Sequence, residues 1–396
     1  MFRFFLVTGI GLAIINGWIS WWLWRALSGT GWLRFVLCAL VLVLGAAFPL
    51  LYKGHGDTLA HVWLLRAGAF WMGVAFYVFV LVVLADLWGL GARILGSAPP
   101  EAPRWGAVLL VLGLPLLLGV GSWFNAAFPE LRHYNITIHM QGPIPSAYVD
   151  KPLKLGVITD MHLGRLITAG RLARSMELLA PEKPDAIFYV GDIIDDHIKL
   201  DADATAAALA LTQPPLGHWA VPGNHEYISG SIDKSMDFLH RVGMQVLRDQ
   251  WAVVDDSFVL AGRDDLGKPG FTGTQRASLT DILADLPAQY RHLPLVVLDH
   301  QPAALDEARE AGTALMLSGH THYGQLWPFN FVTELKYENP MGLLTKGNFH
   351  SIVSAGTGTW GPPLRTTSRA QVLLVTVHFV AEDKAPADNT PEEKAP

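Results

Sequence analysis

The first third of the chain consists of long apolar stretches separated by short polar connections. Four uncharged stretches stand out: Phe4 to Trp24, Phe35 to Tyr52, Ala67 to Leu84 and Trp105 to Phe124. Each holds about 18–21 residues, the length that an α-helix needs to cross about 30 Å of hydrocarbon. Tryptophan and tyrosine gather at the ends of these stretches, where their amphipathic rings prefer the headgroup region of a bilayer. The pattern therefore predicts four transmembrane helices within residues 1–125.

After the last apolar stretch the pattern changes to short apolar runs, typical of β-strands, alternating with segments of helical spacing. Residues 126–150 form a linker and a first strand, because His133 to Met140 alternates apolar and polar side chains. Strands that alternate with helices predict an α/β layered domain over residues 151–380. Residues 381–396 are rich in Pro, Ala, Glu and Lys, and we expect them to be a disordered tail.

Five of the predicted strands end in polar side chains of a few types. The five ends are Asp160-Met161-His162, Gly191-Asp192-Ile193-Ile194-Asp195, Gly223-Asn224-His225-Glu226, Asp299-His300 and Gly319-His320-Thr321-His322. The carboxyl ends of strands are where α/β sheets bind their ligands. One such motif would be consistent with solvated loop residues, whereas five in one domain indicate a common site. Carboxylate, amide and imidazole donors without cysteine suit Mn²⁺, Fe²⁺ or Zn²⁺.

Composition narrows the class of protein further. Of 396 residues, 51% are hydrophobic and only 16% are charged, which is too apolar for an ordinary soluble enzyme. The formal net charge of −6 is spread thinly and no basic block is present, so no nucleic-acid partner is expected. The single cysteine, Cys38, lies in an apolar stretch, which excludes a disulfide framework and a thiolate metal site.

The five motifs together resemble the calcineurin-like metallophosphoesterase superfamily over about residues 130–380. They match its series D-x-H, G-D-x-x-D, G-N-H-E, H and G-H-x-H in order. The sequence is most similar to the membrane-associated bacterial branch that includes the YaeI and YkuE phosphoesterases, on Val221–Tyr227 and Leu317–His322. Tyr323 stands where this branch often has glycine. The resemblance implies an N-terminal bundle of four transmembrane helices followed by a four-layer α/β/β/α metallophosphoesterase sandwich.

The resemblance also implies roles for individual residues and two divalent metal ions as cofactors, Mn²⁺, Fe²⁺ or Zn²⁺. Seven side chains match metal ligands: Asp160, His162 and His322 for the first ion, Asn224, His300 and His320 for the second, and Asp192 as the bridge. His225 matches the catalytic position that steadies or protonates the leaving oxygen.

Four neighbouring residues have weaker assignments. Asp195 is expected to support the ligands rather than to bind metal. Asp299 would either orient a ligand imidazole or point to solvent. Arg365 and Arg369 follow a glycine-rich run, and they would either contact a substrate phosphate or lie in a surface loop.

The predicted function is metal-dependent hydrolysis of a phosphomonoester, a phosphodiester or a pyrophosphate, with a lipid-linked ester included, by water activated between two metal ions. The alternative is a catalytically silent, membrane-tethered sensor or binding protein that retains the fold. The complete ligand set together with His225 favours the enzyme. A transporter with a regulatory domain is disfavoured, because the apolar stretches lack buried charge.

The resemblance implies a multi-pass protein of the bacterial inner membrane. Four helices put both chain ends on one side, and basic residues are almost evenly divided between the two sides. The connections after the first and third stretches carry Arg25, Arg34, Arg93 and Arg104, and the other side carries Arg3, Lys53, Arg66 and Arg132. The four arginines of the first and third connections fit the cytoplasmic side slightly better than the other set does. Together with a catalytic domain without cysteine, they favour an extracytoplasmic catalytic domain.

Overall fold

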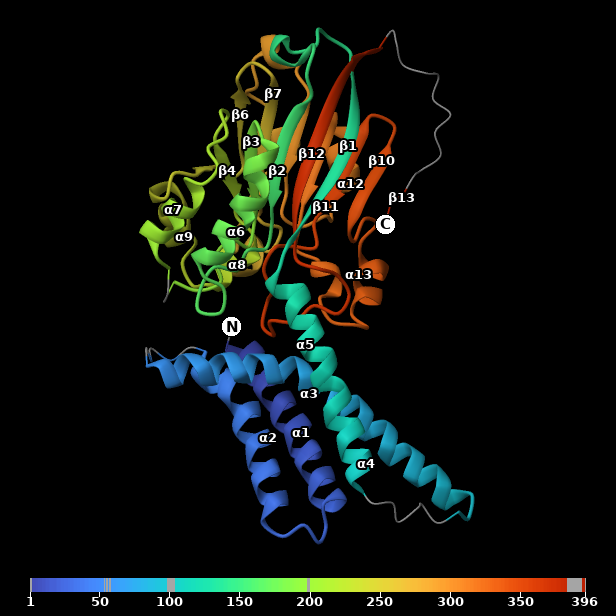
Figure 1. Ribbon diagram of the computed structural model, residues 1–396. Coiled ribbons are helices and arrows are strands. Elements are labelled where there is room, and N and C mark those ends of the chain that lie inside the picture. Colours follow the sequence, from blue (N-terminus) through green and yellow to red (C-terminus); the bar gives the residue numbers. More distant parts are fainter. Residues whose placement is uncertain are drawn as a thin grey trace. The chain divides into compact units, whose positions relative to one another are not determined.

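The chain divides into two compact units in the computed structural model, which describes residues 2–52, 54, 56, 58–97, 104–197, 200–382 and 394–395 (Figure 1). We call Met1–Ala127 together with Trp360–Thr366 the helical unit. Phe128–Thr359 together with Thr367–Pro396 form the sheet unit.

The helical unit contains four apolar helices, as the sequence predicts. Its elements are α1 (Phe2–Ala26), α2 (Trp32–Leu51), α3 (Leu59–Ile94), α4 (Arg104–Val108), the π-helical turn η1 (Leu109–Gly113) and α5 (Leu114–Ala127). Val7–Ala26, Trp32–Leu51, Leu59–Ile94 and Trp105–Ala127 are long and apolar enough to cross a membrane. The fourth span contains a π-turn directly before Pro115, whose ring would otherwise clash with a carbonyl of the preceding turn.

Two polar side chains of the helical unit, Asn16 and Asp86, have hydrogen-bond partners on another helix. Asn16 is buried, accepts a hydrogen bond from Trp71 Nε1 (2.8 Å) and donates one to the Leu12 carbonyl (2.7 Å). Asp86 of the long helix α3 accepts from Arg25 of α1 at 2.8 Å. These bonds join α1 to α3, because a polar group in an apolar bundle is stable only with a partner.

The segment Trp360–Thr366 belongs to the helical unit although it lies far along the chain. The Arg365 backbone N–H donates to the Ser122 carbonyl (3.0 Å), and the Arg365 side chain is fully buried. The interpretation of Arg365 as a surface-loop residue is therefore wrong. Arg369 belongs to the sheet unit, is half exposed and pairs with Glu130 (3.3 Å).

The sheet unit is built on two mixed sheets. The first has the order β1 (Glu130–Met140), β12 (Gln371–Ala381), β2 (Leu153–Ile158), β3 (Ala186–Val190), β4 (His218–Val221) and β5 (Gln245–Val246). The second has the order β13 (Lys394–Ala395), β10 (Gly342–Lys346), β11 (Phe349–Val353), β9 (Thr313–Ser318), β8 (Leu295–Leu298), β7 (Phe258–Gly262) and β6 (Gln250–Val254). The tail predicted to be disordered, residues 381–396, lies mostly outside the described residues.

Helices cover the outer face of each sheet. Those on the first are α6 (Ala169–Leu179), α7 (Ala202–Leu209) and α9 (Ile232–Arg241), and those on the second are α11 (Leu279–Ile282) and α12 (Leu305–Glu310). The remaining helices lie in connections: α8 (Asn224–Ile228), α10 (Lys268–Thr272), α13 (Asn330–Lys336) and the 3-10 turns η2 (Ser146–Tyr148), η3 (Ala180–Glu182), η4 (Ala288–Tyr290) and η5 (His322–Gly324).

The central strands of the two sheets are apolar on both faces because both faces are buried. In β3, Phe188 and Val190 pack between the sheets, whereas Ile187 and Tyr189 pack against the helices of the first sheet. Side chains of a strand point alternately to opposite faces, so an unbroken apolar run fits a sheet covered on both sides. The predicted four-layer α/β/β/α sandwich is confirmed.

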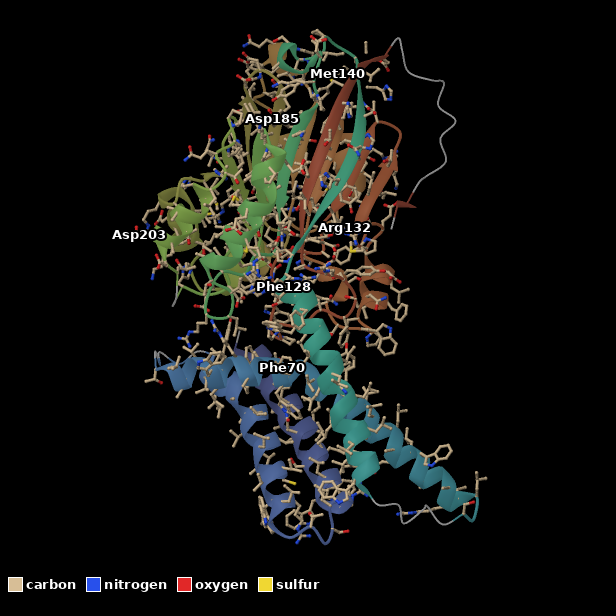
Figure 2. All side chains as sticks on the ribbon, viewed as in Figure 1. Phe70, Phe128, Arg132, Met140, Asp185 and Asp203 are labelled. Atoms are coloured by element: carbon tan, nitrogen blue, oxygen red, sulfur yellow. The ribbon has the colours of Figure 1, made fainter. Side chains whose placement is uncertain are left out.

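Strand direction decides which residues lie at the carboxyl ends of the strands in the first sheet and which lie at the amino ends. β2, β3 and β4 are mutually parallel, so their carboxyl ends meet at one edge, which we call the carboxyl edge. β12 is antiparallel to β2, and β1 is parallel to β12. β1 therefore begins at the carboxyl edge. Figure 2 shows this arrangement: Met140, at the end of β1, and Asp185, just before β3, lie at one end of the unit, and Arg132 lies toward the other.

Candidate metal centre

The seven predicted metal ligands come together at the carboxyl edge. Asp160 and His162 follow β2, Asp192 follows β3 and Asn224 follows β4; His300 follows β8, while His320 and His322 follow β9 of the second sheet. Five strands of two sheets thus deliver side chains that are distant in sequence to one place. The structure shows the gathering of these residues, and their binding of metal stays a prediction.

The backbone at this edge is strained. Five of the seven residues have a positive φ: Asp160 (50°), His162 (53°), Asp192 (50°), His320 (69°) and His322 (47°). A residue other than glycine in the left-handed region costs about 1–3 kcal/mol and persists only where the surrounding structure holds it. Backbone bonds across the edge supply that restraint, including His162 N–H to the Asp192 carbonyl (2.9 Å). Such clustering is typical of functional sites.

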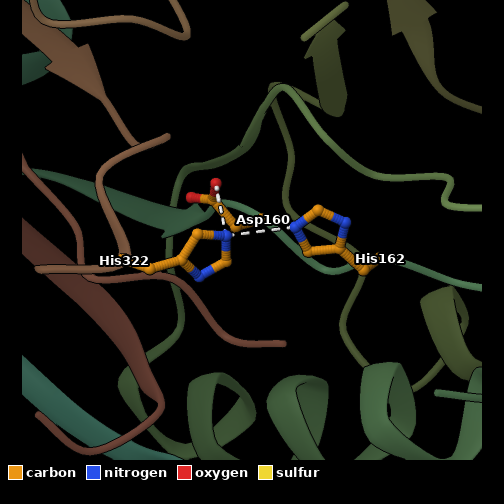
Figure 3. Close-up of side chains that lie close together, drawn as sticks. All are labelled: Asp160, His162 and His322. Atoms are coloured by element: carbon orange, nitrogen blue, oxygen red, sulfur yellow. Dashed lines mark hydrogen bonds and ion pairs between the residues drawn. The ribbon is translucent and has the colours of Figure 1, made fainter. Parts of the chain in front are cut away.

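The first group of ligand atoms consists of Asp160, His162 and His322 (Figure 3). His322 Nε2 lies 3.2 Å from His162 Nε2 and 3.5 Å from Asp160 Oδ1. The Asp160 carboxylate also accepts the backbone N–H of His320 at 2.9 Å, which ties the β2 loop to the β9 loop. Two imidazoles and one carboxylate facing one point can hold one divalent ion.

The second group consists of Asp192, His300 and His320. Asp192 Oδ2 lies 3.2 Å from His300 Nε2 and 3.9 Å from His162 Nε2, so this one oxygen faces both groups. His300 Nδ1 donates to the Val190 carbonyl (2.9 Å), because a carbonyl can only accept. This bond leaves Nε2 as the ring nitrogen available to an ion, the usual way in which a second hydrogen bond orients a ligand imidazole.

Asn224 Oδ1 is buried and, among the described residues, has no hydrogen-bond partner. A buried amide oxygen without a donor is costly unless an ion or water binds it. Its turn is packed tightly, since a side-chain carbon at Gly223 would lie 2.3 Å from Asp192 Oδ1, and only glycine allows that approach. The donor set and this orphaned oxygen fit a pair of divalent ions.

Burial and neighbouring charges shift the pKa values of several of the candidate ligands. Burial raises the pKa of Asp160, and burial together with the neighbouring His300 lowers the pKa of His320 to about 3. Burial also opposes ionisation of Asp192, but the imidazoles of His300 and His225 hold its pKa well below the usual range. The edge is a buried cluster of carboxylates that requires compensating positive charge.

His225 is arranged to carry a proton. Its Nδ1 lies 2.8 Å from Asp195 Oδ1, and its ring packs edge-on against the His162 ring. Burial would lower the pKa of His225, but Asp192 and Asp195 raise it to about 9. Asp195 contacts His225 and, at 3.5 Å, His162 Nδ1, so its position is the supporting one expected from the sequence.

Asp299 occupies neither of the two positions considered for it from the sequence. It is fully buried, and its carboxylate pairs with Arg276 Nη1 (2.8 Å) and Arg263 Nη1 (3.4 Å). Both interpretations, orientation of a ligand imidazole and exposure to solvent, are therefore wrong. The arginine partner follows β7 in the run Arg263-Asp264-Asp265, a further strand end that the motifs did not include. Its signal was available in the sequence: three charged residues directly follow the apolar run Phe258–Gly262.

Tyr323 adopts the left-handed conformation (φ 47°), which explains why glycine suits this position in the branch that the sequence resembles. Its hydroxyl donates to Glu334 Oε1 of α13 at 2.6 Å. The ring is thus directed to α13, and this bond holds the helix to the ligand loop.

Glu226 joins two of the ligand loops. Its Oε2 accepts the backbone N–H groups of Gly223 (2.7 Å) and Asp192 (3.1 Å), and Oε1 accepts that of Ile194 (2.8 Å). Burial and the Asp192 carboxylate raise the pKa of Glu226 to about 7. Glu226 lies in the third motif, but the sequence assigned no role to it. The sequence could not show this role, because the backbone groups of Asp192 and Ile194 that it binds belong to another loop.

Residues 153–324 match the family description Calcineurin-like phosphoesterase. The chain is 33% identical over 272 residues to an uncharacterised metallophosphoesterase of Aquifex aeolicus, which covers 67% of this chain and 97% of that protein. It is 29% identical to a transmembrane protein with metallophosphoesterase domain of Danio rerio, over 87% of this chain and 80% of the relative. It is 28% identical to phosphodiesterase YaeI of Escherichia coli, over 57% of this chain and 82% of that protein.

The role of Glu226 can be tested with Glu226→Gln, because an amide cannot accept at both ends as the carboxylate does. We expect Mn²⁺ binding to weaken by about 10–100-fold, as for other partners of metal-binding loops. Isothermal calorimetry at pH 8, above the pKa of about 7, measures the affinity. Glu310→Gln, on the exposed face of α12, is the matched control. An unchanged affinity in Glu226→Gln would show that the two loops keep their positions without it.

Proposed function

This chain belongs to the calcineurin-like metallophosphoesterases. We therefore propose that its seven clustered side chains bind two divalent metal ions, and that it uses water activated by these ions to hydrolyse a phosphoester. Family membership makes it a metal-dependent hydrolase of ester bonds. The observation that carries the two-ion proposal is the position of Asp192 Oδ2, which faces His300 at 3.2 Å and His162 at 3.9 Å. A shared carboxylate of this kind is what a pair of neighbouring ions requires.

The clustered side chains divide into two sets of candidate metal ligands and one candidate proton donor. Asp160, His162 and His322 would bind one ion, Asn224, His300 and His320 the other, and Asp192 both. When bound, such ions activate water and stabilise charge on phosphoryl oxygens, and Mn²⁺, Fe²⁺ and Zn²⁺ suit this donor set. The protonated His225, held at Nδ1 by Asp195, has its other nitrogen to donate to the leaving oxygen. A positioned acid of this kind contributes about 10²–10⁴-fold.

The second candidate, a silent sensor, predicts at least one altered ligand position. All seven positions and His225 hold suitable donors, which supports the enzyme. The substrate is a phosphomonoester, a phosphodiester or a pyrophosphate, and a lipid-linked one is favoured. The argument is physical: four candidate spans tether the site to a membrane, and tethering raises the local concentration of substrates in that membrane.

Removal of metal tests the reaction. With the full-length protein in detergent, hydrolysis of a chromogenic phosphoester should be lost after chelation and dialysis, and Mn²⁺ should restore it, because the proposed nucleophile is a water activated by the metal ions. The release of 4-nitrophenolate measures the rate. Undiminished turnover in protein shown by elemental analysis to be metal-free would contradict the mechanism.

Two substitutions separate metal binding from proton donation. Asp192→Asn should lose both metal ions, because one carboxylate serves both groups. His225→Ala should keep the metal, and kcat should fall by about 10²–10⁴-fold. Elemental analysis and steady-state kinetics distinguish the two variants, with Asp237→Asn and His240→Ala on the exposed face of α9 as controls. A metal-free His225→Ala protein would place His225 among the ligands instead.

We also propose that the protein is a multi-pass protein of the bacterial inner membrane with an extracytoplasmic sheet unit, as the distribution of arginines favours. In spheroplasts, external protease should therefore digest the sheet unit. Alkaline phosphatase fused after Pro396 should be active, and green fluorescent protein at the same position should be dark. Resistance in intact spheroplasts, with digestion only after lysis, would place the unit in the cytosol.

A further inference from the structure

Exposed apolar side chains concentrate in one short segment of the sheet unit. The segment contains Trp327 (54% exposed), Phe329 (44%), Phe331 (52%), Val332 (57%) and Leu335 (90%), and we call it the 327–335 surface. The other large apolar side chains exposed in the described part of this unit are Phe128, Val149, Leu211, Leu266 and Phe271. A contiguous apolar patch of this kind marks a surface that binds a partner or a membrane.

The helix in this segment, α13, exposes its apolar face instead of burying it. At 3.6 residues per turn, Phe331, Val332 and Leu335 of α13 share one face about 100° wide, and that face is exposed. The Glu334 side chain turns away from it to bond Tyr323. The apolar face is therefore the outer one, which is the arrangement of helices that lie at a membrane surface.

The helix is fixed to the candidate metal centre. Tyr323, directly after the ligand His322, bonds Glu334 at 2.6 Å, and the Tyr337 ring at the end of α13 packs edge-on against the His320 ring. Gly324 makes a close approach to the helix start, where a side-chain carbon would lie 2.2 Å from the Asn330 nitrogen. Anything that binds the 327–335 surface is thereby held next to His320.

The chain also enters the sheet unit at the edge that carries the ligands. Glu130, the first residue of β1, pairs with Gln371 of β12. Thr357 joins the Gln371 carbonyl (2.8 Å) to the Thr159 carbonyl (2.9 Å), next to the ligand Asp160. The fourth candidate span ends at Ala127, and three residues of extended chain reach at most about 11 Å. Few residues therefore separate the end of a candidate span from the start of β1 along the chain.

From these observations we propose that the 327–335 surface inserts into the headgroup region of the membrane with which the helical unit associates. Tryptophan and phenylalanine are the side chains that this region favours. The substrate class follows, and this second step rests on the proposed function: the phosphoester is carried by an amphiphile whose apolar part stays in the bilayer while its phosphate reaches the ligand edge.

Insertion is tested in the full-length protein with Cys38→Ser, which removes the only cysteine. A single cysteine introduced by Leu335→Cys carries an environment-sensitive fluorophore, and Val149→Cys, exposed before β2 at the opposite edge, is the matched control. In phosphatidylcholine vesicles containing nitroxide-labelled lipid, quenching at position 335 should exceed that at position 149 at least threefold. Equal quenching at the two positions would overturn the insertion.

The substrate class is tested with two chromogenic diesters, methyl and hexadecyl 4-nitrophenyl phosphate, the second embedded in vesicles, with Mn²⁺. The wild-type protein should prefer the hexadecyl ester at least tenfold in kcat/KM. The double variant Val332→Glu/Leu335→Glu should lose this preference, whereas Val149→Glu should keep it. Equal turnover of both esters by the wild type would refute the amphiphilic substrate, but it would contradict neither the membrane insertion nor the proposed function. Turnover of neither ester, nor of 4-nitrophenyl phosphate or pyrophosphate, by metal-loaded protein would count against the proposed function, and the quenching ratio would still decide the insertion.

Discussion

The two oxygens of the buried Asp192 carboxylate face different parts of the carboxyl edge. Oδ1 accepts the backbone N–H of His225 at 2.7 Å, and Oδ2 faces the imidazoles of His300 and His162. A charged carboxylate in this position is stable only with compensating positive charge. The close turn at Gly223, the carboxylate bonds of Glu226 and the left-handed backbone of the ligand residues all serve to hold groups around this one side chain.

The surrounding sandwich supplies the rigidity that such a cluster needs. Side chains of β3 pack on both faces, so the strand that delivers Asp192 cannot shift without disturbing two cores. A second buried network, in which Asp299 is held by Arg263 and Arg276, lies beside the candidate ligand His300. Its charges are paired with each other, which leaves the imidazole of His300 to its bond with the Val190 carbonyl.

Two further features lie at the carboxyl edge of the sheet unit, the start of β1 and the helix α13. β1 begins there because it is parallel to β12 and β12 is antiparallel to β2. The exposed face of α13 lies beside the ligand loop because Tyr323 and Tyr337 hold the helix there. An exposed apolar surface beside the cluster of candidate ligands is consistent with an enzyme that works on molecules at a bilayer surface.

The sequence by itself determined the elements whose signal is local. Apolar runs of sufficient length predicted the four helices, and short apolar runs ending in Asp, Asn or His predicted the strands and the residues that meet at the carboxyl edge. Only the tertiary structure decided which partner each polar group has. Asp299 faces two arginines, Arg365 is buried in the helical unit and Glu226 binds another loop, and each of these contacts joins residues far apart in sequence. The apolar face of α13 likewise turned outward rather than into a core, because Glu334, on another face of the helix, bonds Tyr323. Local patterns record how a segment folds, whereas pairing and exposure depend on what other segments bring to it.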